Sequence, residues 1–455
     1  MPPQLSLREK WGYGVADLGA ALSYNAINFF LLFFLIEVVG LRPALAGLVL
    51  LSARLIDAVT DPLMGMITDR TRSRWGRRKP YIWAGAVPFG ITFALLWTVP
   101  DASQATMFIF AALAVALHVV VFTIVQVPYM ALTPELAPEY SERTALTSYR
   151  VGFSTLASLL AAAAPPLLVA LLNSGQGLPQ DARYGWVGMG LIFGALMTLA
   201  YLVMAATVRE RRTLQVPFGA LNLWQEYRSA FAVFGYPQVL LLFMVVTIGL
   251  GIVSSILPFY LVSAIRLSPG EQTGILGLLF GVAILALPAW NILSARAGKK
   301  AAFTAGLLIL SLGLLLLVTL SPPGYLSPLL LLFTILAGLG VATVLLFPWA
   351  MLPDVVEFDE LNTGQRREGL LYAIFTFGQK LAFALGAFLN AQMLELVGYQ
   401  RGAIEQSAQA VLGIQWMIGP VASAAFLVAV LMVWRYPITK AKHEEARAAL
   451  ARRQP

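Results

Sequence analysis

Two carboxylates lie four residues apart inside an apolar stretch of the chain, in the segment ARLIDAVTDP at 53–62. At this spacing Asp57 and Asp61 share one face of a helix. Each charge buried in a membrane costs at least ~2.5 kcal/mol, and two like charges repel further unless a cation or a proton binds between them. Pro62 removes a backbone hydrogen bond and frees carbonyl oxygens nearby. Hard oxygens of this kind suit sodium or a proton relay, and a structural ion pair with Arg54 is the alternative.

A lone cation, Lys380, lies within a second apolar stretch, TFGQKLAF at 376–383. A lysine in such a place needs a partner, and Asp57 or Asp61 is the obvious candidate. A lysine that pairs with these acids when the cation is absent would couple ion binding to conformation. The alternative is a lysine near a helix end that extends its amine to the membrane surface.

Other polar residues lie in or beside apolar stretches. Thr123 and Gln126 are one turn apart on one helical face, where ordinary hydrogen bonding between helices is the alternative to a binding role. Arg150 is either a substrate contact or a gate residue at the membrane interface. Asp354, Glu357 and Arg366 flank a polar loop, where they could form a salt-bridge gate or remain solvated.

The composition requires that these residues be positioned by membrane helices. Of the 455 residues, 59% are hydrophobic and 12% are charged, whereas soluble domains carry about 25% charged residues. So much apolar surface must face lipid, where the backbone is satisfied only in helices or closed barrels. The apolar runs are long rather than alternating, which favours helices.

We predict twelve spans, six on each side of the longest polar break. They lie near 12–39, 43–68, 80–99, 105–132, 146–172, 185–208, 237–265, 272–295, 300–320, 327–353, 368–397 and 409–434. The chain then divides into an N-terminal six-helix bundle at 1–208, a central cytoplasmic loop at 209–234, a C-terminal six-helix bundle at 235–435 and a cytoplasmic tail at 436–455.

The basic residues favour an orientation with both termini in the cytoplasm. In that arrangement only four of the 31 Lys and Arg residues fall in outer loops, namely Arg42, Arg183, Arg266 and Arg401. The net charge of +8 is then explained by topology and by contact with anionic membrane lipid, without a nucleic-acid partner. We expect a multi-pass monomer in the plasma (inner) membrane.

The residue types in the sequence give little support for an enzymatic function. The chain has no cysteine and only two histidines, one in a predicted span and one in the tail. Thiol chemistry is excluded, a zinc site is not indicated, and no nucleophile or general base lies in a catalytic setting. We therefore expect a transporter with no catalytic residues and no cofactor.

Several segments resemble the glycoside–pentoside–hexuronide:cation symporters, the melibiose-carrier branch of the major facilitator superfamily. They are GYGVAD at 12–17, ARLIDAVTDPLMG at 53–65, RSRWGRRKP at 72–80, VPY at 127–129, SYR at 148–150, LPD at 352–354 and RREG at 366–369. The resemblance runs over nearly the whole chain, and Lys380 falls at the family's lysine in span eleven.

The resemblance implies an all-α membrane protein with the major facilitator fold, which couples entry of sodium, a proton or lithium to uptake of a sugar by alternating access. The implied cation site is Asp57, Thr60, Asp61 and Thr123, with Thr60 where sodium-using carriers have asparagine. The implied cytoplasmic gate is Asp354, Glu357 and Arg366.

The sugar site departs from the melibiose pattern, because its two acidic positions correspond to Ala21 and Gln126. A different sugar or glycoside could still bind a set of polar side chains, namely Tyr24, Asn25, Gln126, Arg150, Thr376 and Gln379. The segment LFPWAMLPD at 346–354 is similar to that of the sodium-dependent lysophosphatidylcholine symporters. A lysolipid is therefore the alternative substrate.

Overall fold

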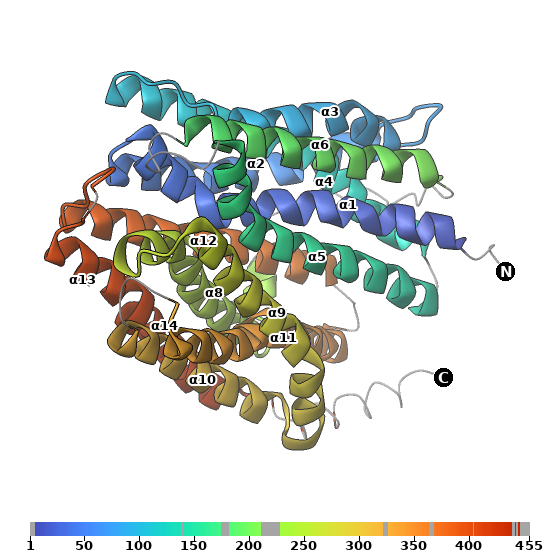
Figure 1. Ribbon diagram of the computed structural model, residues 1–455. Helices are drawn as coiled ribbons and strands as arrows, with labels where there is room; N and C mark the ends of the chain where they lie inside the picture. Colours follow the sequence, from blue (N-terminus) through green and yellow to red (C-terminus); the bar gives the residue numbers. More distant parts are fainter. Residues whose placement is uncertain are drawn as a thin grey trace. The chain divides into compact units, whose positions relative to one another are not determined.

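The structure, a computed structural model of the chain, describes most of its 455 residues. The described residues are 5–137, 140–173, 182–210, 228–321, 326–363, 368–403, 405–438, 442 and 445. They form helices joined by short turns, and no strand occurs among them (Figure 1). The predicted all-helical class is confirmed for this part of the chain.

The helices up to residue 207 follow the predicted spans in order. They are α1 (Leu7–Ala26), η1 (Ile27–Leu31), η2 (Phe34–Val39), α2 (Pro43–Arg70), α3 (Lys79–Leu95), α4 (Gln104–Leu136), α5 (Tyr140–Leu172) and α6 (Arg183–Thr207). A capping box between Ser6 and Glu9 starts α1, since each side chain accepts the other's backbone N–H. The first span ends in two π-helical turns, η1 and η2, and Gly40 closes it at φ +83°.

The helices from residue 236 onward also follow the predicted spans in order. They are α8 (Tyr236–Phe259), η4 (Tyr260–Ala264), α9 (Pro269–Ala297), α10 (Lys299–Leu320), α11 (Pro328–Thr363), α12 (Glu368–Leu396), α13 (Ala408–Trp416), η5 (Met417–Val421) and α14 (Ala422–Arg435). Like the first span, the α8 span ends in a π-helical turn. The central loop and the tail lie largely outside the described residues.

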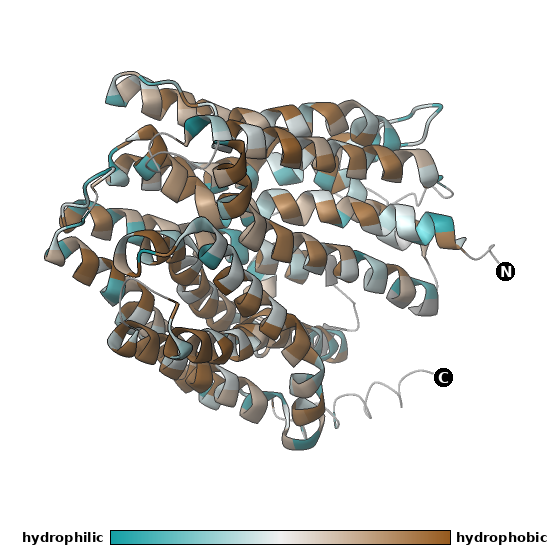
Figure 2. Cartoon of the chain, viewed as in Figure 1, coloured by the Kyte–Doolittle hydropathy of each residue, from teal (hydrophilic) through white to brown (hydrophobic). Residues whose placement is uncertain are grey.

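Ten described helical segments are long and apolar enough to cross a membrane. The first span, which η1 and η2 interrupt, and α3, which is 17 residues long, are not among the ten. Large apolar side chains such as Leu55 and Val59 on α2 are exposed rather than packed inside. Figure 2 shows hydrophobic residues along the helices and hydrophilic residues gathered at helix ends and in turns. This distribution is typical of a lipid-facing surface.

Contacts divide the chain into two compact units. Unit 1 consists of Met1–Val216, Ser268–Gly277 and Leu394–Ser407, and unit 2 of Pro217–Leu267, Leu278–Met393 and Ala408–Pro455. The predicted bundle boundaries remain predictions, and two short segments from the second half of the sequence belong to unit 1.

Within unit 1, α1 packs against α5 and α6, α2 against α4, and α3 against α4 and α6. Glycines permit the close approach of α3 and α6, because a Cβ atom at Gly90 would lie 2.2 Å from the carbonyl oxygen of Gly194. Within unit 2, α10 packs against α11 and α14, and α8 against α11 and α14.

Candidate functional site

The two acids on α2 have different partners. Asp57 is 2% exposed, and its Oδ2 atom lies 3.0 Å from Nη1 of Arg54, one turn earlier on the same helix. Asp61 instead accepts a hydrogen bond of 2.8 Å from the Thr123 hydroxyl of α4. Asp61 therefore lies at the α2–α4 contact, and the ion pair of Asp57 with Arg54 that the sequence left open is present.

Hydroxyl oxygens extend this cluster. The Thr60 and Thr123 hydroxyls lie 3.4 Å apart, and Thr60 donates to the carbonyl oxygen of Ile56. The structure thus brings Thr60, Asp61 and Thr123 to one α2–α4 contact, and Asp57 lies one turn earlier on α2. Among the described residues, no three His, Asp or Glu side chains converge on a metal position. A cation here would need hydroxyl or carbonyl oxygens beside the carboxylates, which suits sodium or a proton better than a transition metal.

A small cavity adjoins the Arg54–Asp57 pair. The space open to the centres of water molecules is ≈ 40 Å³, enough for a few waters. Tyr24, Arg54, Asp57 and His118 contribute to its lining, and the Arg54 guanidinium lies 5.7 Å from the centre of the Tyr24 ring. The buried Nε of Arg54 has no hydrogen-bond acceptor among the described residues.

His118 ties three helices together at this cavity. Its Nε2 lies 2.8 Å from the Ser23 hydroxyl on α1, and its Nδ1 lies 3.1 Å from the Thr92 hydroxyl on α3. Because the Thr92 hydroxyl donates to the Phe89 carbonyl oxygen, its oxygen must accept from Nδ1–H. Nε2 and the Ser23 hydroxyl share the second hydrogen bond, so His118 of α4 holds α1, α3 and α4 together.

A second polar cluster joins α1, α4 and α5. The Arg150 guanidinium donates to Asp17 at 2.5 Å and lies 5.3 Å from the centre of the Tyr129 ring. The Tyr13 hydroxyl donates to the Tyr129 carbonyl oxygen at 2.7 Å, and the Tyr129 hydroxyl lies 3.1 Å from the Tyr13 carbonyl oxygen. Both rings are fully buried. We name Tyr13, Asp17, Tyr129 and Arg150 the α1–α4–α5 clamp.

Several residues predicted to bind substrate have partners inside unit 1. Gln126 accepts a hydrogen bond of 2.6 Å from the Tyr201 hydroxyl. Asn25 donates to the Ala21 carbonyl oxygen and to the Ser158 hydroxyl. Thr376, Gln379 and Lys380 are half-buried on α12, in unit 2. A substrate-binding role for any of them stays a prediction.

The predicted gate is described in part. Both oxygens of Asp354 lie 2.7 Å from the Lys299 amine, which also donates to the Ala350 carbonyl oxygen. Glu357 follows on the same helix and is half-buried, and Arg366 lies outside the described residues. The sequence did not indicate Lys299 as the partner of Asp354.

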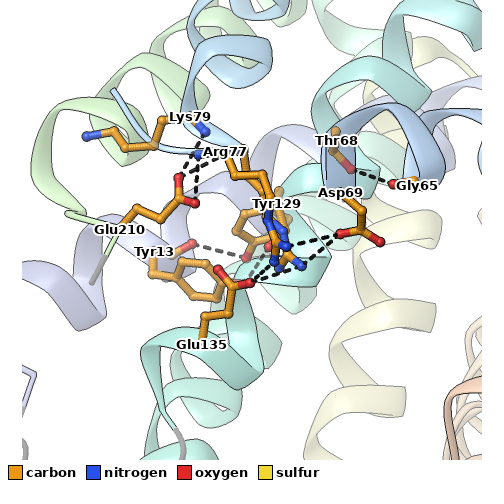
Figure 3. Close-up of polar contacts among 10 residues, drawn as sticks. Tyr13, Gly65, Thr68, Asp69, Arg77, Lys79, Tyr129, Glu135 and Glu210 are labelled. Carbon is orange, nitrogen blue, oxygen red and sulfur yellow. Dashed lines mark hydrogen bonds and ion pairs between the residues drawn. The ribbon is translucent and has the colours of Figure 1, made fainter. Parts of the chain in front are cut away.

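The basic loop between α2 and α3 is held by acids from other elements (Figure 3). Arg77 and Arg78 bind Glu135 of α4 at 2.5 and 3.1 Å, and Asp69 lies slightly farther away. Burial raises the pKa of the Glu135 carboxyl, and the nearby guanidinium groups of Arg78 and Arg77 lower it again in part. The Glu210 carboxylate accepts the backbone N–H groups of Arg77 and Arg78, at the start of α3.

Replacing Gly76 by alanine is expected to destabilise this loop by ~1–2 kcal/mol. Gly76 has φ +100°, and a Cβ atom there would lie 2.1 Å from Oε2 of Glu210. The midpoint of thermal unfolding of purified protein measures the effect. Gly152→Ala is the control, since a Cβ atom there meets no other atom within 4 Å. Equal midpoints for the two variants would refute the account of this loop.

A family model described as "MFS/sugar transport protein" matches residues 12–440. The chain therefore belongs to this family of major-facilitator membrane transporters, and it is a transporter rather than an enzyme.

Relatives agree with this assignment along the whole chain. An "uncharacterized symporter" of Synechocystis is 30% identical, over 99% of this chain and 98% of its own. A "putative glycoside/cation symporter" of Escherichia coli is 28% identical, over 97% and 94%. The "sodium-dependent lysophosphatidylcholine symporter 1" of Gallus gallus is 26% identical, over 98% and 89%. The predicted resemblance to both groups is confirmed.

Solved structures support the fold alone. A bacterial homologue of the human lysosomal transporter Spinster, in an inward-facing and occupied conformation, matches with a TM-score of 0.69 at 13% identity. The match covers 95% of this chain and 97% of that chain. The major-facilitator type of fold is thereby confirmed, and the exact number of twelve spans remains a prediction.

Proposed function

We propose that this protein is a cation-coupled symporter that imports a sugar or glycoside by alternating access. Asp57, Thr60, Asp61 and Thr123 form the cation site. The observation that carries the proposal is the contact of Asp61 with the Thr123 and Thr60 hydroxyls between α2 and α4, one turn after the buried Asp57, within an apolar helix. Ionisable residues in such a position mark ion pathways.

The charges of this cluster suit one monovalent cation. Arg54 neutralises one of the two carboxylates, so Arg54, Asp57 and Asp61 together carry a charge of −1 when ionised. A charge of that sign inside the membrane is stabilised when sodium or a proton binds at Asp61. Binding at this cluster would then favour one conformation, as alternating access requires.

Removing the Arg54 charge should change the affinity of the site for cations. We expect Arg54→Gln to raise the affinity for the coupling cation by ~10-fold, because Asp57 then needs a second positive partner. Arg54→Lys keeps the charge and serves as the control. Thermal unfolding measured against sodium concentration and pH reports the affinity. An Arg54→Gln variant with unchanged affinity would contradict an Arg54 that neutralises Asp57.

Lys380 is the proposed coupling residue. A lysine in a transmembrane helix requires a counter-charge, and the acids of α2 are the proposed alternating partners. Asp354, Glu357 and Arg366 are the proposed cytoplasmic gate, and the close Lys299–Asp354 ion pair supports an ionic role for Asp354. We further propose twelve spans in two six-helix halves, a monomer in the plasma membrane, and both termini in the cytoplasm.

Tyr24, Asn25, Gln126, Arg150, Thr376 and Gln379 are the proposed substrate contacts. Similarity to a protein named as a glycoside/cation symporter supports a sugar or glycoside. The second candidate substrate is a lysophospholipid. Asn25, Gln126 and Arg150 already bind partners within unit 1, which leaves fewer groups for the hydroxyls of a sugar. This observation favours the lysophospholipid.

Ligand-induced stabilisation of the purified protein distinguishes the two substrates. Thermal unfolding is measured with a panel of glycosides and with lysophospholipids, each with and without sodium and at two pH values. Stabilisation by a glycoside that increases with the cation supports the proposal, because a ligand that binds the native state raises its stability. Cation-dependent stabilisation by lysophospholipid alone would replace the sugar with the lipid. Stabilisation that no cation influences would refute coupled transport.

A further inference from the structure

A buried carboxylate, Glu37, stands in the last turn of the first span, at the end away from the N-terminus. Its side chain is only 3% exposed. Its two oxygens accept hydrogen bonds from the Tyr399 hydroxyl at 2.9 Å and from the Gly402 backbone N–H at 3.0 Å. Both donors lie in Leu394–Ser407, which we name the clasp segment.

The clasp segment also supplies a cation to the carbonyl end of the same helix. Arg401 donates to the carbonyl oxygens of Glu37 at 3.2 Å and of Val38 at 2.7 Å. These carbonyls lie at the negative end of the helix dipole, where a guanidinium is stabilising. A Cβ atom at Gly40 would lie 2.3 Å from Nη1 of Arg401, so a larger residue there would displace the guanidinium.

A side chain of the opposite charge lies beside the start of the next helix. Glu395 of the clasp segment accepts the backbone N–H of Ala44 at 3.2 Å, in the first turn of α2. The clasp segment thus places Arg401 at the carbonyl end of the first span and Glu395 at the amide end of α2. Each charge has the sign that its helix end favours. Such complementarity indicates a specific docking contact rather than chance packing.

The topology gives this contact a mechanical consequence. The clasp segment belongs to unit 1, whereas the chain directly before it, up to Met393, and directly after it, from Ala408, belongs to unit 2. Movement of α12 and α13 relative to unit 1 must therefore pull on the clasp segment or break its contacts with Glu37.

We propose that the clasp segment is a releasable latch on the first span, closed by Glu37 and opened once in each transport cycle. The inference rests on the alternating access of the proposed function. When the latch opens, Glu37 and Arg401 lose these bonds and return to water, so opening is reversible and requires no covalent step. Glu37, Tyr399 and Arg401 act on transport through conformation and are positioning residues.

Cross-linking tests the latch directly, because the chain has no cysteine. Glu37→Cys and Tyr399→Cys are combined and treated with a short bifunctional thiol reagent that a reductant removes. We expect cross-linked protein in proteoliposomes to lose uptake by at least ~10-fold, as for a transporter held in one conformation. Reduction should restore uptake. Cross-linked protein that transports like the untreated double variant would overturn the latch.

A matched pair controls for reagent and position. Arg42→Cys and Gln104→Cys join the turn before α2 to the start of α4, where the Arg42 backbone N–H donates to Gln104 at 2.9 Å. Both positions lie in the uninterrupted stretch Met1–Val216 of unit 1, whereas Tyr399 lies in a segment flanked on both sides by unit 2, so the control cross-link should leave uptake unchanged. Equal loss of uptake in this pair would show that the first result is not specific to the latch.

Hydrogen exchange provides a second test without cysteines. Tyr399→Phe removes one hydrogen bond to Glu37, and amide exchange in residues 397–403 should accelerate by ~5-fold. Unchanged exchange would count against the latch. Both tests can fail or succeed independently of ion coupling. Uptake that needs no cation would refute the proposed ion coupling, but the effect of the cross-link on that uptake would still test the latch.

Discussion

Replacing Asp61 by asparagine is expected to abolish cation-driven accumulation of substrate, by ~10²-fold or ~2.7 kcal/mol. Asp61 lies on α2, and its Oδ1 atom accepts a hydrogen bond from the Thr123 hydroxyl of α4. An asparagine preserves the shape and the hydrogen bond but removes the charge that a cation would balance. Uptake into proteoliposomes under an imposed sodium or proton gradient measures the effect.

Two further variants complete this experiment. Asp57→Asn should also impair coupling, because it leaves the Arg54 guanidinium without its carboxylate. Asp69→Asn is the control on the same helix, since its side chain is 35% exposed and its arginine contacts are 3.6 to 3.9 Å long. Accumulation at wild-type levels in Asp61→Asn would rule out this carboxylate as the coupling site.

Replacing Asp17 by asparagine is expected to cause the largest loss of stability, ~3 kcal/mol. Asp17 and Arg150 form an ion pair with little solvent exposure, and breaking it leaves a buried guanidinium without its counter-charge. The midpoint of thermal unfolding should fall by roughly 3 °C. Differential scanning fluorimetry on detergent-purified protein measures this fall.

A double variant separates charge from packing in the α1–α4–α5 clamp. Arg150→Met in the Asp17→Asn background removes both charges and should recover part of the lost stability. Tyr129→Phe deletes only a hydroxyl and should cost about 1 kcal/mol. If Asp17→Asn is no worse than Tyr129→Phe, the ion pair is not what holds α1 to α5.

Local sequence patterns predicted the helices and the acids on α2. A long apolar run specifies a membrane helix, and a spacing of four places Asp57 and Asp61 on one helical face. Helical spacing also gave the Arg54–Asp57 ion pair as an alternative, since Arg54 lies one turn before Asp57, and the structure contains that pair. Helical period does not specify the interruption of the first span by η1 and η2, because the same composition supports either hydrogen-bond pattern.

Contacts between distant helices could not be predicted from the sequence. Asp17 and Arg150 are 133 positions apart, and Glu37 and Tyr399 are 362 positions apart. An isolated acid in an apolar helix indicates that a partner exists, but not which residue it is. Asp17 and Glu37 could have been singled out by that reasoning, since each is an acid in the first predicted span. Their partners could be identified only from the three-dimensional structure.

The coupled flux of cation and substrate tests the central claim most directly, namely that the acids of α2 bind one cation for each substrate imported. Proteoliposomes containing wild-type protein are given the substrate found by thermal stabilisation, and inward fluxes of sodium, protons and substrate are recorded together. The net charge of −1 on Arg54, Asp57 and Asp61 predicts one monovalent cation per substrate, and no coupled cation flux in Asp61→Asn. Wild-type substrate flux that moves no cation would contradict the account.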